Sequence, residues 1–378
     1  MKLISFYLPQ YHSIPENDEW WGKDFTEWTN VKNAKPVFKG HVQPKIPLNE
    51  NYYNLLDDNT KIWQAKTAKE AGIYGFCYYH YWFNGKKLLE KPAEQMLENK
   101  DIDINFCFSW ANEPWSRSWQ GKTTDVLMPQ SYGDKHDWIE HFEYLLPFFK
   151  DDRYIKENNK PIFIIYKPDI IPSIIEMKDC WDSIARENGF DGIYWGFQFP
   201  TCFRNRVFET SFDFGIEFEP LYTRMWEESF VALDNLRNKI LFLKKHPYLF
   251  FRYSYKKFKN EFLNKPIVYD YVKTNQLAVG RAPYFINAVP GIFTGWDKTP
   301  RNGNKAAIYN NSSPEAFKRF LEIKIRQAKE IYHTDYLFVT AWNEWGEGAY
   351  LEPDEQYGMG YLNAVQETLK DYNILNEF

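Results

Sequence analysis

Eight short apolar runs of strand type recur along the chain, and this repetition constrains the fold more than any other feature of the sequence. Near-continuous apolar strands that alternate with helices are typical of a parallel sheet whose faces the helices cover. Amphipathic helical patterns lie between most of the runs, for example at 58–72, 134–150 and 314–332. The alternation predicts an α/β fold, a (β/α)8 barrel of TIM type that residues 1–378 form as a single domain. The runs cover residues 2–8, 73–79, 104–110, 161–167, 192–199, 212–218, 283–290 and 336–342.

Polar and aromatic residues follow most of these runs, at the strand ends where a (β/α)8 barrel carries its active site. A doubly wound sheet would gather its site at one switch point, so this spread favours the barrel. Side chains alternate along an extended strand, so about half of those in the second run face the helices. For His12, Tyr79 and His80, a structural hydrogen-bond donor is the alternative to a hydroxyl-binding role. The candidate substrate-binding residues at these ends are Gln10, Tyr11, His12, Tyr79, His80, Trp82, Asn112, Glu113, Trp115, Glu219, Trp296, Asp297 and Asn343.

The composition points to carbohydrate and away from several other ligand classes. Tryptophan, tyrosine and phenylalanine make up 19% of the residues. Flat rings stack on the C–H faces of sugars, so this excess favours a carbohydrate cleft, with a larger aromatic core as the alternative. The net charge of -5 gives no electrostatic footprint for nucleic acid. The four cysteines form no CxxC pair and no glycine-rich phosphate loop follows a strand, so we expect no metal and no cofactor.

Two segments of the sequence, the N-terminal stretch and residues 223–265, bear on where the protein is located. The opening stretch, MKLISFYLPQYHSIPEND, has too few apolar residues for a signal peptide or a membrane span, which predicts a cytoplasmic protein. Residues 223–265 read as a mostly helical insertion after the sixth predicted strand. Within it, 237–265 carries nine Lys or Arg against the single acid Glu261, interleaved with tyrosine and phenylalanine. One interpretation is a solvated basic face whose aromatics pack onto the barrel; the other is contact with an anionic glycolipid or membrane, peripheral to the inner membrane.

The stretch AWNEWGEGAYLEPDEQYG at 341–358 carries the strongest chemical signal. Breaking or moving a glycosidic bond requires one group that protonates the leaving oxygen and a second that stabilises or attacks the positive centre, and Glu344 and Glu347 supply this pair. Both reach one pocket only if the chain turns after Trp342, and Gly346 and Gly348 ease that turn. Two close carboxylates also raise one another's proton affinity, which yields an acid and a base. The alternative is a salt bridge from either glutamate to a loop Lys or Arg.

Two further features of the motifs bear on this choice. Trp342 and Trp345 are candidates for dry walls or for a stacking platform beside the two glutamates. Asn112 and Glu113 stand directly after the third predicted strand, in an arrangement seen in many barrel glycosidases. Carboxylates at three separate strand ends are difficult to assign to salt bridges alone.

Several long runs stand out along the chain: FYLPQYH at 6–12, EWWGKDFTEWTNV at 19–31, FCYYHYWFNGKKLLEKP at 76–92, WANEPW at 110–115, GWDKTPR at 295–301 and AWNEWGEGAYLEPD at 341–354. These runs resemble the WbsX-like proteins of bacterial polysaccharide gene clusters, which are similar to the glycoside hydrolase family 99 endo-α-mannosidases. The resemblance spans nearly the whole chain and adds Trp21 to the candidate substrate-binding residues. It implies a metal-free barrel that retains anomeric configuration. It also implies that Glu344 acts as a base on the sugar 2-hydroxyl, through an anhydro-sugar, and that Glu347 is the general acid/base.

The sequence therefore predicts an enzyme that cleaves or transfers an α-linked glycosidic bond in bacterial surface polysaccharide or O-antigen metabolism, as a retaining glycoside hydrolase. The expected partner is an oligosaccharide or a lipid-linked glycan, and no nucleic acid. The first alternative is a glycosyltransferase that uses an activated sugar donor, which the missing nucleotide-binding loop disfavours. The second is a catalytically silent glycan-binding protein, which could dispense with Glu344 or Glu347.

Overall fold

A parallel sheet that closes into a barrel forms the centre of the molecule in the computed structural model, which describes residues 1–117, 122–199, 211–228, 240, 243–244, 247–283 and 286–372. The strands follow one another around the sheet in the order β12-β10-β9-β8-β4-β2-β1-β15-β13. Only Pro290 separates β12 from β13, so the two ends of this order meet in one interrupted strand. The predicted (β/α)8 barrel is confirmed. The strands are β1 Lys2–Tyr7, β2 Gly75–Phe83, β4 Asn105–Trp110, β8 Lys160–Ile165, β9 Tyr194–Phe199, β10 Phe214–Glu217, β12 Ala288–Val289, β13 Gly291–Phe293 and β15 Tyr336–Thr340.

The seventh barrel strand differs from its prediction in both position and continuity. The apolar pattern predicted a strand over 283–290, whereas pairing begins at Ala288 and continues beyond Pro290 to Phe293. Proline has no N–H to donate to a ladder, which is why the strand is interrupted there. The first half pairs with β10 and the second with β15, so this strand closes the barrel.

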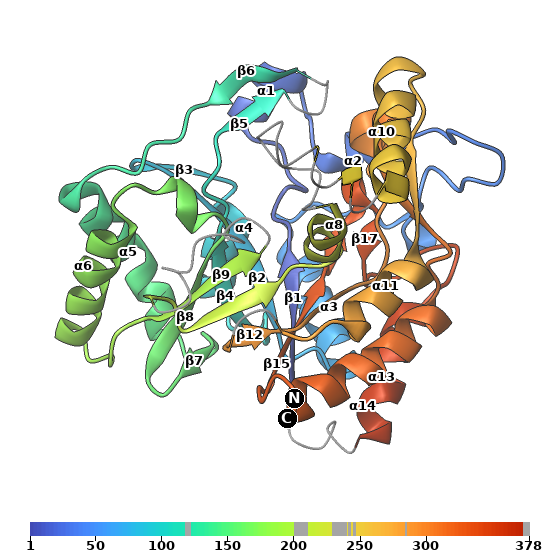
Figure 1. Cartoon of the computed structure of the whole chain (residues 1–378). Coiled ribbons are helices and arrows are strands. Elements are labelled where there is room, and N and C mark those ends of the chain that lie inside the picture. Colours follow the sequence, from blue (N-terminus) through green and yellow to red (C-terminus); the bar gives the residue numbers. More distant parts are fainter. Residues whose placement is uncertain are drawn as a thin grey trace.

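Helices cover the outside of the barrel, with α5 and α6 packed together over one side and α13 and α14 over the other (Figure 1). Their ends follow ordinary capping chemistry. In α3, Asp57 accepts a hydrogen bond from the backbone N–H of Asn59, and Gly72 ends the helix in the left-handed conformation. The described helices of eight or more residues are α3 Asp58–Ala71, α4 Lys91–Glu98, α5 Lys135–Lys150, α6 Ile174–Glu187, α8 Leu221–Glu228, α10 Pro247–Phe262, α11 Tyr271–Gly280, α13 Pro314–Glu330 and α14 Gly360–Asp371.

Shorter elements gather above the carboxyl ends of the strands, at the top of Figure 1. β5 and β6 pair as an antiparallel hairpin there, and β16 and β17 form a second one. These elements build the loops that a barrel uses for binding. They are α1 Pro15–Trp21, α2 Glu27–Asn33, β5 Trp115–Arg117, β6 Lys122–Met128, α12 Thr299–Asn302, β16 Asn343–Glu344 and β17 Ala349–Tyr350. The remaining strands lie off the barrel and are β3 Lys86–Leu88, β7 Lys156–Glu157, β11 Ile267–Asp270 and β14 Ala307–Asn310.

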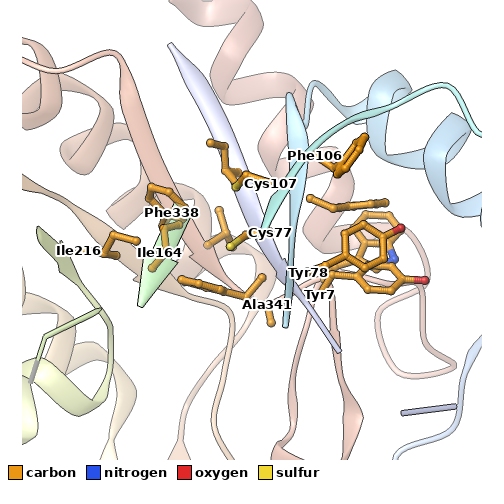
Figure 2. Packing of buried hydrophobic residues seen from close by; sticks show 14 of the residues in the cluster. Tyr7, Cys77, Tyr78, Phe106, Cys107, Ile164, Ile216, Phe338 and Ala341 are labelled. Carbon is orange, nitrogen blue, oxygen red and sulfur yellow. The ribbon is translucent and has the colours of Figure 1, made fainter. Parts of the chain in front are cut away.

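The barrel interior is filled by side chains from alternate strand positions (Figure 2). Cys77 and Cys107 stand opposite one another in β2 and β4 and are fully buried. Gly196 in β9 leaves room for the ring of Phe214 in β10, because an added Cβ would lie 2.3 Å from that ring. Side chains of one parity therefore close the barrel below the site, and those of the other parity pack against the helices.

The predicted basic insertion is only partly covered by the described residues. α8 and α10 both lie between β10 and β11, and residues 229–239, 241–242 and 245–246 fall outside the described part. The insertion as a whole therefore stays a prediction. Among the described residues, no helix has the length and apolar character needed to cross a membrane.

Candidate active site

A cavity of about 470 Å³ opens among the loops at the carboxyl ends of the barrel strands. It lies where a (β/α)8 barrel places its chemistry, and both motif glutamates reach it. Six of the predicted substrate-binding residues also line it: Gln10, Trp21, Tyr79, Glu113, Trp115 and Trp296. The other lining residues are Leu8, Tyr81, Ala111, Pro114, Ser116, Leu127, Tyr166, Phe218, Leu221, Lys298, Arg301, Thr340, Glu344 and Glu347.

A tight turn brings the two glutamates to the same cavity. The barrel strand β15 ends at Thr340, and the chain then forms the β16–β17 hairpin, whose connecting residues Trp345–Glu347 make a single 3-10 turn. Glu344 ends one strand of this hairpin and Glu347 ends the turn. Gly348 follows with φ of 61°, a conformation that suits glycine. The predicted turn after Trp342 is thus present.

The guanidinium of Arg301 joins both glutamates to a third carboxylate, Glu27. Its Nε and Nη2 donate to the two oxygens of Glu27, each at 3.0 Å. Its Nη1 donates to Glu347 at 2.5 Å, and Nη2 approaches Glu344 at 3.3 Å. Lys298 adds a second cation 2.9 Å from the same oxygen of Glu347. The sequence left open a salt bridge from either glutamate to a loop Lys or Arg as the alternative to catalysis. Both glutamates do form such salt bridges, and their partners Arg301 and Lys298 line the same cavity.

These contacts separate the proton affinities of the two glutamates. Burial raises the pKa of Glu344 to about 8, and the charges of Glu347 and Glu27 add to this effect although Arg301 opposes it. Burial also acts to raise the pKa of Glu347, but Lys298 and Arg301 outweigh it and hold that pKa below its ordinary value. Three carboxylates beside two cations are balanced when one carboxyl group is protonated, and that group is Glu344. The ligand-free site thus holds one acid and one carboxylate at neutral pH.

Position 346 requires glycine because the side chains of Glu27 and Arg301 lie close to its Cα, and not because of the turn. Its φ is not in the left-handed region, so the expectation that it eases the turn is wrong for this glycine. A Cβ at this position would lie 1.9 Å from Oε1 of Glu27 and 3.0 Å from Nε of Arg301. The missing side chain lets Glu27 and Arg301 pack directly under the turn.

We expect Gly346→Ala to lower turnover by about 10²-fold, because the added methyl group displaces Glu27 and Arg301 and so misplaces both glutamates. The measurement is kcat on a glycan substrate together with the melting temperature. Gly280→Ala is the matched control, since that glycine has no atom within 4 Å of an added Cβ. Equal turnover of the Gly346 and Gly280 variants would contradict this account.

Several predicted binding residues hold the catalytic turn from below instead of lining the cavity. The hydroxyl of Tyr11 donates to the carbonyl of Asn343 at 2.5 Å and accepts from the backbone N–H of Trp345 at 3.1 Å. The side-chain amide of Asn343 pairs with both backbone groups of Leu8. Trp345 and Trp342 are buried, so neither offers a stacking platform to a ligand. These residues position the site.

His80 and Trp82 face the helices and are not part of the cavity. The Nε2 atoms of His80 and of His141 in α5 lie 2.8 Å apart, and the ring of Trp82 stacks on His141 at 4.5 Å. The indole N–H of Trp82 donates to Asp137. Burial lowers the pKa of His80 to about 3, so this histidine is neutral. The structure therefore assigns His80 the alternative that the sequence left open, a structural role.

Glu219 and Asp297 are engaged in ion pairs and hydrogen bonds outside the cavity. Arg281 donates to Glu219 at 3.0 Å, in a buried cluster behind β10. Asp297 lies 2.8 Å from His41 and accepts a hydrogen bond from Gln43 at 2.6 Å. Both carboxylates stabilise loops, and neither reaches the two glutamates of the turn.

The remaining candidates divide between the cavity rim and the core. Asn112 exchanges two hydrogen bonds with the backbone of Lys167, and the amine of Lys167 pairs with Glu113 at the rim. His12 is buried outside the cavity, where burial and the nearby Lys61 lower its pKa to about 4. Glu113 is the only one of these that a ligand in the cavity would meet.

Arg301 and Lys298 are the functional residues that the sequence prediction missed. Both lie in the run 295–301, which supplied Trp296 and Asp297 as candidates, but no apolar or glycine pattern marks the two cations. Tyr81 and Tyr166 also line the cavity and were not among the candidates. The sequence could have identified both tyrosines. Tyr81 lies two residues after Tyr79 and so faces the same side of the strand, and Tyr166 directly follows β8. Among the residues that the structure describes, no group of three or more His, Cys, Asp or Glu side chains could hold a metal ion.

The sequence matches known proteins over nearly its whole length. The profile of the family described as Glycosyltransferase WbsX matches residues 3–365. The protein WxcX of Xanthomonas campestris pv. campestris, from strains B100 and ATCC 33913, is 33% identical over 373 residues, which cover 97% of this chain and 49% of WxcX. The chain therefore spans about half the length of these curated relatives.

Solved structures show the same fold. The GH99 endo-alpha-mannosidase of Bacteroides thetaiotaomicron superposes with a TM-score of 0.57 in its complex with BIS-TRIS-propane and 0.56 without it, at 12% and 13% identity. Each match covers 100% of this chain and 98% of the other. A glycoside hydrolase-like protein matches with a TM-score of 0.52 at 14% identity, over 97% of this chain and 93% of its own. At such identities these matches establish the fold alone.

Proposed function

Because the chain belongs to the WbsX glycosyltransferase family, a family of carbohydrate-active proteins, we propose that it is an enzyme that acts on an α-linked glycosidic bond in bacterial surface polysaccharide or O-antigen metabolism. The proposed reaction is hydrolysis with retention, and the proposed substrate is an oligosaccharide or a lipid-linked glycan. We further propose a cytoplasmic location, peripheral to the inner membrane. The observation that carries the proposal is the pair Glu344 and Glu347, which one guanidinium holds at an aromatic-lined cavity.

This pair suits glycosidic chemistry because its two members hold one proton between them. Protonation of the leaving oxygen needs an acid, and activation of an attacking oxygen needs a base. Following the resemblance, Glu344 would take the proton of the sugar 2-hydroxyl while the 2-oxygen attacks the anomeric carbon. Glu347 would protonate the leaving oxygen and later activate water. The rings of Trp21 and Trp115 would stack on the sugar faces.

These roles require the proton to move between the two glutamates when substrate binds. The ligand-free site keeps the proton on Glu344, whereas a general acid role for Glu347 needs it there. A ligand that draws Lys298 away from Glu347 would raise the proton affinity of Glu347 and produce this transfer. The exchanged assignment, with Glu344 as acid and Glu347 as base, needs no transfer. A substrate whose leaving group requires no proton distinguishes the two assignments.

Turnover of a glycosyl fluoride decides the roles, since fluoride leaves without protonation. If Glu347 is the acid, Glu347→Gln keeps the release of fluoride in the first turnover, which needs no acid, and loses turnover of the glycan, while Glu344→Gln loses both. The reversed pattern would establish the exchanged roles. Loss of neither activity in either variant would refute the proposed function. The natural bond is found by incubating the enzyme with a panel of O-antigen fragments and resolving the products by mass spectrometry.

The pH dependence of kcat/KM should be bell-shaped, because the active pair holds one proton in either assignment. Activity should rise as Glu347 ionises, below pH 4.5, and fall as Glu344 loses its proton near pH 8. In Lys298→Met both limbs should move to higher pH, since Lys298 lowers the pKa of both glutamates. Lys66→Met, a change at an exposed lysine of α3, is the control and should leave the profile unchanged. An unmoved acid limb in Lys298→Met would count against this electrostatic account.

The runner-up is a glycosyltransferase, which the description of the family favours. Such an enzyme would transfer a sugar from an activated donor to an acceptor hydroxyl and would need only one base. The second, protonated carboxyl group favours hydrolysis. Product analysis with and without a nucleotide-sugar donor separates the two reactions. A catalytically silent binding protein is the third candidate, and any turnover that depends on Glu344 or Glu347 excludes it.

A further inference from the structure

Helix α10 carries a stripe of exposed aromatic rings. The stripe consists of Tyr248, Phe251, Tyr255, Phe258 and Phe262, whose exposed fractions range from 49% to 74%. Their spacing of three or four residues puts all five within about 80° of the helix circumference. Side chains this apolar rarely stay exposed in a row on a monomer unless the surface binds something. These five rings therefore do not pack onto the barrel.

The opposite side of α10 is attached to the protein by polar contacts. The side-chain amide of Asn260 donates to the carbonyls of Lys265 and of Lys305, at 3.1 and 3.2 Å. The amine of Lys256 lies 4.1 Å from the ring centre of Tyr269 in β11. A helix on the surface of a globular protein normally turns its apolar face inward. In α10, Asn260 and Lys256 face the protein, whereas the five rings of the stripe face outward.

The sequence around the stripe is rich in positive charge. The sequence from 243 to 265 has seven Lys or Arg and one acidic residue, Glu261. Glu261 pairs with Lys257 at 3.7 Å. The amine of Lys259 lies 4.5 Å from the ring centre of Tyr255, beside the stripe. Aromatic rings flanked by lysines match the headgroup region of a bilayer that contains anionic lipid.

We propose that α10 is a membrane-surface helix, whose aromatic stripe inserts among the headgroups of an anionic lipid bilayer. A second copy of the chain would also suit rings at this spacing, but pairing two such helices would bring their lysines together without acids to balance them. Charge complementarity thus favours the lipid surface. The helix lies parallel to the bilayer plane, with the body of the protein outside the membrane.

The position of α10 relates this surface to the active site. Asn260 is hydrogen-bonded to Lys305, four residues after Arg301 in the cavity wall. In Figure 1, α10 stands beside the loops at the carboxyl ends of the barrel strands. Docking through α10 would therefore bring the cavity close to the bilayer. Together with the proposed function, on which this step rests, the arrangement makes a lipid-linked glycan the favoured substrate.

Vesicle flotation tests the surface without any measurement of activity. We expect the full chain to float with phosphatidylglycerol vesicles at low salt, to bind less at high salt, and not to bind phosphatidylcholine vesicles. Phe251→Ser with Phe258→Ser should weaken the partition coefficient about tenfold per ring. Lys244→Gln with Lys257→Gln should weaken it about 30-fold.

Matched changes elsewhere on the surface should leave vesicle binding unchanged. Ile331→Ser removes an apolar side chain that is 48% exposed, and Lys66→Gln removes an exposed lysine of α3. The proposal is overturned if the wild-type chain does not float at low salt, or if the control changes weaken binding as much as the Phe251/Phe258 and Lys244/Lys257 double changes. It is also overturned if the stripe variant loses only a dimer, measured by analytical ultracentrifugation, because the stripe would then join two copies.

Turnover separates the membrane surface from the proposed reaction. In the Phe251 and Phe258 double variant, we expect turnover of a water-soluble glycan fragment to match the wild type. Turnover of the same glycan on a lipid carrier in phosphatidylglycerol vesicles should fall at least tenfold, as binding does. Equal loss on both substrates, or on neither, would refute the link to lipid-linked substrate. Wild-type protein that binds vesicles but processes no glycan would refute the proposed function and leave the membrane surface standing.

Discussion

Glu347→Gln is expected to lower turnover of a glycan substrate by about 10²–10⁴, the usual contribution of general acid–base catalysis. The amide is nearly the same size as the carboxylate but can neither donate nor recover the proton of the leaving oxygen. The fold should survive the change. Arg301 remains held by two hydrogen bonds from its guanidinium to Glu27, and the turn is held from below by Tyr11 and Asn343.

The measurement is kcat under saturating substrate, with circular dichroism and the melting temperature as checks of folding. Glu367→Gln, at an exposed residue of α14 that pairs with Lys318, is the matched control and should keep wild-type turnover. A correctly folded Glu347→Gln enzyme that keeps more than half the wild-type turnover would show that this carboxylate only anchors Arg301 and Lys298.

The barrel could be predicted from the sequence because most of its strands are marked by a local apolar run. Apolar runs of six to nine residues, such as β2 and β4, fill both faces of a parallel strand and so form continuous apolar stretches. The interrupted strand around Pro290 was misplaced, because its two halves belong together only when β10 and β15 flank them. That pairing is a property of the closed sheet and leaves no mark in the local pattern.

A barrel carries its active site at the carboxyl ends of its strands, and this expectation located the two glutamates. It did not decide which of the other strand-end residues face the cavity. Along β2, Tyr79 and Tyr81 face the cavity while His80 and Trp82 face α5. The two pairs alternate, so one step in register decides which of them meets a ligand. The sequence shows that the side chains alternate, but not which of the two sets faces the cavity. His80 has the titratable side chain, but Tyr79 and Tyr81 are the residues whose side chains face the cavity.

Arg301 shows why the electrostatics of the site lay beyond the sequence. Its strongest partner, Glu27, is 274 residues away along the chain and comes from a different loop. A short basic segment has no periodicity, and a buried arginine differs in no local way from an exposed one. The contact depends on Gly346, whose missing side chain makes the space. The sequence predicted that two carboxylates would share a pocket, but the cations that separate their proton affinities appear only when the loops meet.

Glu344→Gln is expected to bind intact glycan and to process it at least 10²-fold more slowly, because the amide cannot accept the proton of the 2-hydroxyl. If Glu344 is that base, a 2-deoxy or 2-fluoro substrate should also bind and react far more slowly with the wild-type enzyme, since it lacks the attacking oxygen. The pKa of about 8 adds a condition: Glu344 must pass its proton to Glu347 before it can act. Isothermal titration with the intact glycan and single-turnover rates measure binding and chemistry separately.

The covalent alternative makes a different prediction for the same residue. If Glu344 attacked the anomeric carbon directly, the bond to the leaving group would break as a glycosyl ester of Glu344 forms, and a 2-fluoro glycosyl fluoride would trap that ester. Mass spectrometry of the intact protein then finds one added sugar per chain. A 2-hydroxyl base leaves the protein mass unchanged. A stoichiometric adduct on Glu344 would therefore replace the base with a nucleophile while keeping the catalytic pair, and full turnover by Glu344→Gln would remove both roles.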